Sequence, residues 1–178
     1  DTVLVLSDTD IVTGSSSKKT AHVFSPSQPR GILHRAFSIF LFDSSTSELL
    51  LQQRASTKIT FPNVWTNTCC SHPLHGMEPG EVDGPEDVRD GTVMGVKNAA
   101  VRKLEQELGI PVGEVKVEEF KFLTRLHYWA ADTVTHGEKS PWGEHEIDYV
   151  LFATIPSKDK ITLKPHPEEV DDVKWVTQ

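Results

Sequence analysis

The chain has 178 residues, of which 26 are Asp or Glu and 18 are Lys or Arg, and its formal net charge is −8 at pH 7. Its 37% hydrophobic and 25% charged residues are typical of one globular domain and exclude collagen-like, coiled-coil and low-complexity chains. The acidic balance argues against nucleic-acid binding, and the longest nearly apolar run, residues 36–42, is far below the ~18 residues of a membrane helix. We therefore expect one domain over residues 1–178, with no nucleic-acid partner and no membrane insertion.

The first third of the chain predicts mostly strands. Residues 3–6 are apolar and favour a short strand, and the serines and lysines of residues 15–19 favour a polar turn. Residues 31–42 and 48–54 are rich in aromatic, β-branched and leucine side chains, and the polar residues between them predict a turn. These two segments should form a hairpin in the core.

The next segment, residues 75–91, contains glycines, prolines and many carboxylates. We expect a solvated acidic insertion without chemistry of its own. Its acidic residues are Glu78, Glu81, Asp83, Glu86, Asp87 and Asp90.

A helix is predicted directly after this insertion. Apolar residues recur at helical spacing from residue 93 to residue 108, and Gly109 and Pro111 supply a stop. Glu107 lies at the edge of the apolar stripe, where the simplest interpretation is a salt bridge to Lys103 one turn earlier. Strands are expected at residues 120–130, 147–155 and 173–176.

The chain has only two cysteines, Cys69 and Cys70. Adjacent residues have poor geometry for a disulfide with each other, so both thiols should be reduced, as is usual in the cytoplasm. Cys70 precedes His72 by two residues, which in an extended segment places both on one side. The two could share a metal or form a nucleophile with its base, although a buried cysteine is more often only a small apolar side chain.

Acidic residues also alternate near the end of the chain. Glu144, Glu146 and Asp148 share one face of a strand, next to the positions that should enter the core. Neighbouring carboxylates repel one another, and a divalent cation would reverse that repulsion. The alternative is an exposed strand end with a solvated acidic face.

The histidines suggest a metal ion as ligand, and the basic residues suggest a diphosphate. Together with two carboxylates, His22, His34 and His72 would suit zinc, manganese or magnesium better than calcium, provided that they converge. Arg54 and Lys58 straddle the exit of a predicted strand, where they could hold a diphosphate. Each of these side chains alone is more often an ordinary structural or surface residue.

Three segments together closely resemble the type I isopentenyl-diphosphate isomerases of eukaryotic type. They are TNTCCSHPL (residues 66–74), WGEHEIDY (142–149) and GILHRAFS (31–38). The resemblance runs in the family's order from about residue 18 to residue 175, and it includes KITFP (58–62) and RKLEQELGI (102–110). The last segment resembles a degenerate Nudix helix, since Lys103 and Gln106 stand where a diphosphate-hydrolysing member carries glutamates.

The resemblance implies a Nudix-type α/β/α sandwich with a mixed central sheet, an α/β (α+β) fold. It also implies an isomerase that converts isopentenyl diphosphate to dimethylallyl diphosphate. The implied cofactor is Mg²⁺, with Zn²⁺ or Mn²⁺ as alternatives at the His/Glu site, and no organic cofactor is implied. The partner is then a small prenyl diphosphate, and the protein is expected to be a cytoplasmic monomer.

The resemblance further implies roles for individual residues. The positions that match metal ligands are His22, His34, His72, Glu107, Glu144 and Glu146. The positions that match diphosphate contacts are Lys18, Arg54, Lys58 and Arg102. Cys70 matches the catalytic cysteine and Cys69 a position that is not catalytic, while Tyr128 matches a tyrosine that supports Glu146.

Moving a double bond requires an acid and a base, because a proton is added at one carbon and removed from a neighbouring one. Our hypothesis is that Glu146, oriented by the metal and Tyr128, protonates the alkene, and that the Cys70 thiolate removes the allylic proton. A free thiol has a pKa of about 8.5, so His72, the metal and nearby cations would have to favour the thiolate. Candidates to shield the cationic intermediate are the indole rings of Trp65, Trp129 and Trp142.

Members of this family continue past the position of residue 178 with a helical segment that carries an aromatic residue. We therefore expect the chain to be truncated at its C-terminus, with a larger effect on turnover than on fold or metal binding.

Three alternatives stay open. A Nudix diphosphate hydrolase is disfavoured by Lys103 and Gln106. A zinc module closed by Cys69, Cys70, His72 and His75 is disfavoured because structural zinc prefers ligand pairs that are separated in sequence. A non-catalytic paralogue would bind prenyl diphosphate or metal without turnover.

Overall fold

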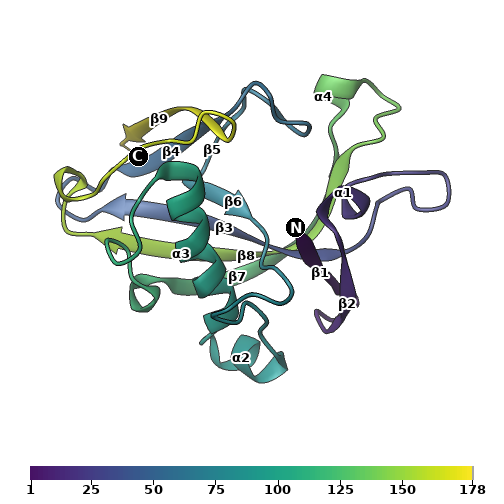
Figure 1. Cartoon of the computed structure of the whole chain (residues 1–178), viewed down its shortest axis with the longest axis horizontal. Helices are drawn as coiled ribbons and strands as arrows, with labels where there is room; N and C mark the ends of the chain where they lie inside the picture. The colour runs from purple at the N-terminus through teal and green to yellow at the C-terminus, as the bar shows by residue number, and fades with distance from the viewer. Residues whose placement is uncertain (178) are drawn as a thin grey trace.

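The computed structural model describes residues 1–177, so residue 178 of the expected domain lies outside the described part (Figure 1). The strands are β1 (Thr2–Leu6), β2 (Val12–Ser17), β3 (His34–Asp43), β4 (Leu49–Arg54), β5 (Trp65–Thr66), β6 (Cys69–Ser71), β7 (Lys121–Ala131), β8 (Gly143–Ile155) and β9 (Val170–Val176). The helices are α1 (Lys18–Ala21), α2 (Pro85–Asp90), α3 (Met94–Leu108) and α4 (Thr133–His136), with short 3₁₀ turns η1 (Val117–Glu119) and η2 (Lys158–Lys160).

The strands form one mixed sheet around β3. This strand runs parallel to β8, with His34 opposite Glu146 at one end and Asp43 opposite Ile155 at the other. It pairs antiparallel with β1, β4 and β6, and β7 extends the sheet beyond β8. The predicted hairpin of β3 and β4 is present, and the predicted mixed α/β architecture is confirmed.

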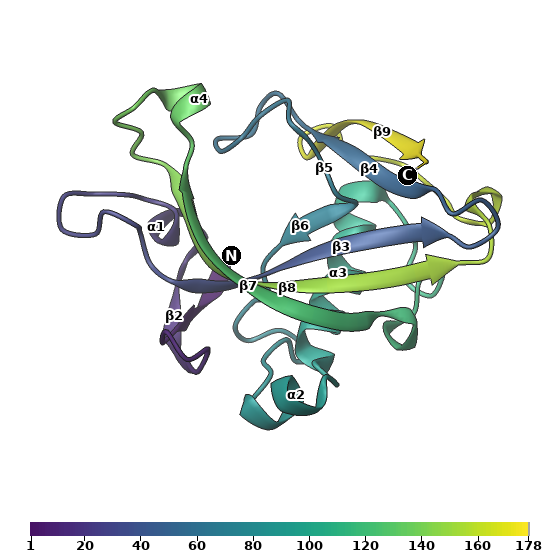
Figure 2. The same ribbon diagram turned by 180° about the vertical axis from the view of Figure 1, so that it is seen from behind.

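The long helix α3 covers one face of this sheet, in front of it in Figure 1 and behind it in Figure 2. The residues of its predicted apolar stripe are all buried, namely Val93, Val96, Ala100, Leu104 and Leu108. The helix ends at Gly109, where φ is 64° and a Cβ atom would lie 2.4 Å from the carbonyl oxygen of Lys164. The other helices have six residues or fewer, so within residues 1–177 the long helical layer covers one face only.

A buried ion pair anchors the beginning of β3. The guanidinium of Arg35 is fully buried and donates to the carboxylate of Asp10, 2.8 Å away in the turn between β1 and β2. Arg125 and the hydroxyl of Tyr149 donate to the second carboxylate oxygen of Asp10. Because Arg35 follows His34 in the strand, this network on one face holds the strand that presents His34 on the other.

Two expectations from the sequence are corrected. Residues 15–19 do not form a turn, because the serines complete β2 against β1 and Ser17 caps α1. The acidic segment before α3 is not wholly solvated, since Glu81 and Asp83 are buried. The carboxylate of Asp83 accepts the backbone N–H groups of Gly95 and Val96 at 2.7 and 2.8 Å, and so binds the first turn of α3.

No helix within the described residues is both long enough and apolar enough to cross a membrane.

Candidate active site

A cavity of about 740 Å³ lies between α1, the sheet and the loop that follows β4. Its wall contains most of the residues that the sequence singled out: Lys18, His22, Arg54, Lys58, Cys70, His72, Glu107, Tyr128, Glu144 and Glu146. His34 lies just behind this wall and is fully buried. One cavity therefore collects residues from distant parts of the chain.

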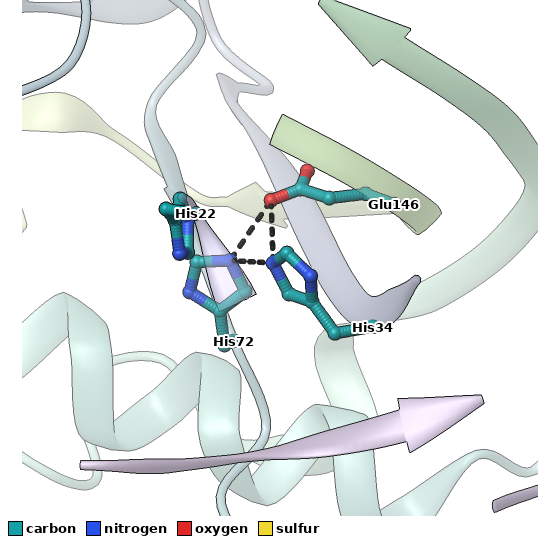
Figure 3. Close-up of side chains that lie close together, drawn as sticks. All are labelled: His22, His34, His72 and Glu146. Carbon is teal, nitrogen blue, oxygen red and sulfur yellow. Dashed lines mark hydrogen bonds and ion pairs between the residues drawn. The ribbon is translucent and has the colours of Figure 1, made fainter. Parts of the chain in front are cut away.

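Three histidines and one carboxylate converge from different parts of the chain (Figure 3). One ligand atom from each of His22, His34, His72 and Glu146 lies within 4.8 Å of all the others. His22 follows α1, His34 begins β3, His72 follows β6, and Glu146 lies in β8 directly opposite His34. The convergence that the sequence could not establish is therefore present, and the cluster could hold a metal ion.

Backbone carbonyls fix the orientation of two of these rings. Nδ1 of His22 lies 2.7 Å from the carbonyl oxygen of Lys18, and Nδ1 of His34 lies 2.7 Å from that of Ile32. A carbonyl only accepts, so each Nδ1 carries the proton and each Nε2 keeps its lone pair. This is the tautomer that a metal-binding histidine requires.

The atoms at the centre of the cluster are close together and rich in lone pairs. Nε2 of His72 lies 2.8 Å from Oε1 of Glu146 and 3.2 Å from Nε2 of His34. Burial, and then the neighbouring His34, lower the pKa of His22 to about 4, and burial lowers the pKa of His72 well below its usual range. The neutral imidazoles of His22 and His72 beside a carboxylate fit a divalent cation of the zinc or manganese type.

The carboxylates on β8 differ in their charge. Although burial opposes the shift, the imidazoles of His34 and His72 beside Oε1 lower the pKa of Glu146 well below the usual range. Burial and the charge of Glu146 raise the pKa values of Glu144 and Asp148 to about 7. One carboxylate is therefore ionised, while its two neighbours on the same face exchange a proton near neutral pH.

Tyr128 links two of these carboxylates from the neighbouring strand. Its hydroxyl lies 2.6 Å from Oε2 of Glu146 and 3.2 Å from Oε2 of Glu144. Burial and the charges of these two residues raise the pKa of Tyr128 far above its usual range. The phenol therefore stays protonated and can only donate to Glu146.

Cys70 faces the same cavity from β6 but does not contact His72. Its Sγ lies 2.8 Å from Oδ1 of Asn67 and 3.4 Å from the hydroxyl of Ser38. Burial raises the pKa of Cys70 to about 12, although Ser38 opposes the shift. This shift favours the protonated thiol over the thiolate that the sequence-based hypothesis requires.

Cys69 points away from Cys70, as the alternation of a strand requires. It is fully buried, and its Sγ lies 3.4 Å from Oε2 of Glu107 on α3. The predicted ion pair of Glu107 with Lys103 is present at 3.0 Å. Since the two thiols lie on opposite sides of β6, the alternative zinc module of Cys69, Cys70, His72 and His75 is not assembled.

Cations also line the cavity, namely Lys18, Arg54 and Lys58. Arg54 donates to the carbonyl oxygens of Thr60 and Phe61 at 2.8 and 2.9 Å, which folds the loop after β4 over the cavity. Burial and the charges of Lys103 and Lys58 lower the pKa of Lys18. Repulsion between neighbouring cations favours binding of an anion among them.

Some candidates are not brought to the cavity. Arg102 binds the carboxylate of Glu81 through Nε and Nη2 at 2.6 and 2.8 Å and is not part of the wall. Trp65 packs under the ammonium of Lys174, and Trp129 lies under Arg30. Of the three candidate indoles, Trp142 alone lines the cavity.

The sequence did not identify Ser38 and Asn67 as site residues. Asn67 accepts the hydrogen bond of the Cys70 thiol, and Ser38 is the residue opposite Cys70 in the register of β3 and β6. Both lie within the segments that resemble the isomerases, but their roles follow from strand pairing, which no local pattern predicts.

Comparison with known proteins identifies the family of this chain. The NUDIX domain family matches residues 32–178. A protein of Deinococcus radiodurans with a solved crystal structure has the same fold, with a TM-score of 0.59 at 14% identity over 99% of this chain and 83% of that one. The chain therefore belongs to the NUDIX domain family.

Curated relatives show to which branch of the NUDIX domain family the chain belongs. The isopentenyl-diphosphate delta-isomerases of Aspergillus fumigatus, Phaffia rhodozyma and Bos taurus are 50%, 45% and 43% identical over 98% of this chain. The chain is thus a member of the isopentenyl-diphosphate delta-isomerase family. It spans 59%, 63% and 68% of the length of these three relatives.

Proposed function

We propose that this chain converts isopentenyl diphosphate to dimethylallyl diphosphate. The observation that carries the proposal is the presence in one cavity of a thiol, an ionised carboxylate, a His/Glu cluster and a group of cations. The cations suit a diphosphate, and the thiol and carboxylate suit proton transfer at carbon. Curated relatives with 43–50% identity carry the name of this activity.

Lys18, Arg54 and Lys58 are proposed to bind the diphosphate. All three line the cavity. Lys58 forms an ion pair with Glu169, and the charge of Lys18 is only partly balanced by Glu107 and Glu169. Arg102 would take part only after it leaves Glu81, so its proposed role is to hold the wall beside His72, whose carbonyl oxygen it contacts at 3.2 Å.

His22, His34, His72 and Glu146 are proposed to hold a divalent metal ion, with Glu144 beside them. Nitrogen ligands make Zn²⁺ or Mn²⁺ the better match for this cluster, whereas Mg²⁺, which prefers oxygen, would be bound by Glu107 together with the diphosphate. A cation at the His/Glu cluster supplies positive charge that keeps Glu146 ionised and fixed in position.

The protonation states suggest which of Cys70 and Glu146 acts as the acid and which as the base. Cys70 holds its proton and is the proposed acid, which adds that proton to the terminal alkene carbon. Glu146 is ionised and is the proposed base, which removes a proton from the neighbouring methylene to complete the double-bond shift. This assignment reverses the roles hypothesised from the sequence, because burial raises the pKa of Cys70 to about 12.

Each turnover then leaves a thiolate and a protonated carboxyl, so a proton must return to sulfur. Ser38 is suited to this transfer, because its hydroxyl contacts Sγ of Cys70 at 3.4 Å and lies close enough to Asp148 to affect its pKa. Asp148 has a pKa raised to about 7 by burial and by the charge of Glu146, and can therefore give or take a proton near neutral pH.

The test is product analysis with isopentenyl diphosphate, Mg²⁺ and Zn²⁺ or Mn²⁺. It uses this chain and a version extended to the length of its relatives. We expect dimethylallyl diphosphate, no released phosphate, and loss of product in Cys70→Ala and Glu146→Gln. Released phosphate would favour the hydrolase, and binding of the substrate without any product from either version would favour a non-catalytic paralogue.

The proposed setting is a monomer in the cytoplasm. Both cysteines are free, which is the state expected of thiols in a reducing compartment. Size-exclusion chromatography with light scattering tests the oligomeric state, and a stable dimer would contradict this part of the proposal.

A further inference from the structure

Two histidines meet on the β7–β8 hairpin, on the face opposite the cavity. Nε2 of His127 lies 3.2 Å from Nε2 of His145, and the ring centroids are 5.4 Å apart with the rings inclined by 20°. The register of the hairpin pairs Tyr128 with Glu146. Because side chains alternate along strands, His127 and His145 lie diagonally across this pair on its other side.

The distance between these nitrogens suits one metal ion. Two imidazole nitrogens bound at about 2.0–2.1 Å to a tetrahedral zinc ion lie about 3.3 Å apart, close to the distance observed here. To bind one ion, both rings would turn so that the two Nε2 lone pairs face the ion rather than each other. His127 is exposed and gives access from solvent, while the half-buried His145 provides a fixed ligand.

We propose that His127 and His145 form a second metal site, which binds a divalent transition-metal ion of the Zn²⁺ type with water in the remaining positions. Hard cations such as Mg²⁺ prefer oxygen ligands and are excluded by this donor set. The site shares no ligand with the His22 cluster, so it does not depend on the proposed isomerase activity.

Neighbouring charge limits the affinity of this site. Arg30 stacks on Trp129, which lies on the same face of β7 as His127, with 5.3 Å between its guanidinium carbon and the ring centroid. Its positive charge opposes cation binding, and only two protein ligands are present. Binding here is therefore weaker than at the His22 cluster, and zinc fills the two sites in that order.

A bound ion would join β7 to β8 directly behind the contact between Tyr128 and Glu146. Without metal, the same two rings are joined by one N–H···N hydrogen bond. This hydrogen bond is weaker than two metal–nitrogen bonds. Zinc should therefore stabilise the hairpin beyond the stabilisation that it gives through the His22 cluster.

Equilibrium dialysis against Zn²⁺ tests this site. The variant is His127→Gln, which removes an exposed ligand, and the matched control is His75→Gln, which removes an exposed histidine elsewhere. We expect His127→Gln to bind one equivalent of Zn²⁺ less than the natural chain, and His75→Gln to bind the same number. Circular dichroism verifies that both variants are folded.

Thermal unfolding provides an independent measurement. In excess Zn²⁺ the natural chain and His75→Gln should gain more in Tm than His127→Gln, whereas Mg²⁺ should not distinguish the three proteins. If His127→Gln binds as many equivalents of Zn²⁺ as the natural chain, the pair is only a hydrogen bond and the proposed site is wrong.

Discussion

The hydroxyl of Tyr128 lies 2.6 Å from Oε2 of Glu146, and the two residues are direct partners in the register of β7 and β8. The other oxygen of the same carboxylate faces His72 and His34. Glu146 is therefore held from both sides, by a phenol that can only donate and by the imidazole cluster. Its position in the cavity follows from strand pairing rather than from a flexible loop.

Tyr128→Phe should lower kcat by about 10- to 100-fold, because a hydrogen bond to a charged group contributes about 1.5–3 kcal/mol. The ring remains in place, so KM should change little. Steady-state kinetics measures this, with Tyr149→Phe as a control that removes a hydroxyl from the opposite face of the sheet. Equal losses of kcat in both variants would contradict a specific role for Tyr128.

The adjacent cysteines provide a matched pair of variants. Cys70→Ala should abolish isomerisation with little change in stability, because Cys70 is only partly buried and faces the cavity. Cys69→Ala should keep activity and lose about 1 kcal/mol of stability, because it shortens a fully buried apolar side chain. Product assays and urea unfolding measure the two effects, and activity retained in Cys70→Ala would remove it from the mechanism.

Two glutamates of the acidic segment before α3 form ion pairs with arginines, one pair buried and one exposed. Glu81→Ala should cost about 3 kcal/mol, because Glu81 is buried and its loss leaves Arg102 unpaired beside the cavity. Glu86→Ala removes a partner of Arg89 in an exposed pair and should cost less than about 1 kcal/mol. Urea unfolding compares the two, and similar losses would contradict the structural role of Glu81.

Asp43 should make stability depend on acid pH. Its carboxylate accepts the hydroxyl of Ser45 at 2.6 Å and the backbone N–H of Lys158 at 2.8 Å, and these bonds lower its pKa from 3.8 to about 2. A lowered pKa stabilises the fold fully above about pH 4, and this stabilisation is lost as pH falls through about 2. The stability difference between the natural chain and Asp43→Asn should therefore shrink over that range.

Unfolding by urea between pH 2 and pH 7 measures this dependence. Ser45→Ala is the partial control, since it removes the hydrogen bond that contributes most to the shift and should weaken the dependence without abolishing it. A difference between the natural chain and Asp43→Asn that stays constant with pH would contradict the assignment.

Local patterns in the sequence predicted the elements and the residue types of the site. The spacing of apolar residues located α3, and the alternation of Glu144, Glu146 and Asp148 placed them on one face of β8, where the structure has them. These features depend on neighbours within a few residues, so a single sequence is sufficient to find them.

The sequence could not give the burial of Glu81 or the position of Trp129. Glu81 is buried because Arg102 of α3 and the N–H of Leu74 bind it, and both contacts form only after the chain folds back on itself. Trp129 alternates with Tyr128, so one residue of the strand faces the cavity and the next faces away. Composition predicts that Glu81 lies in a solvated loop and that Trp129 lines the cavity. Long-range contacts bury Glu81, and strand alternation turns Trp129 away from the cavity.

The parallel pairing of β3 with β8 has a consequence for folding. His72 and Glu146 are 74 residues apart in the chain, and His34 is a further 38 residues before His72. The cluster cannot assemble until these remote strands are paired, and contacts between remote residues form slowly. In refolding experiments, metal capture should therefore appear with the slowest phase and report that the central sheet is complete, since earlier intermediates lack a binding site.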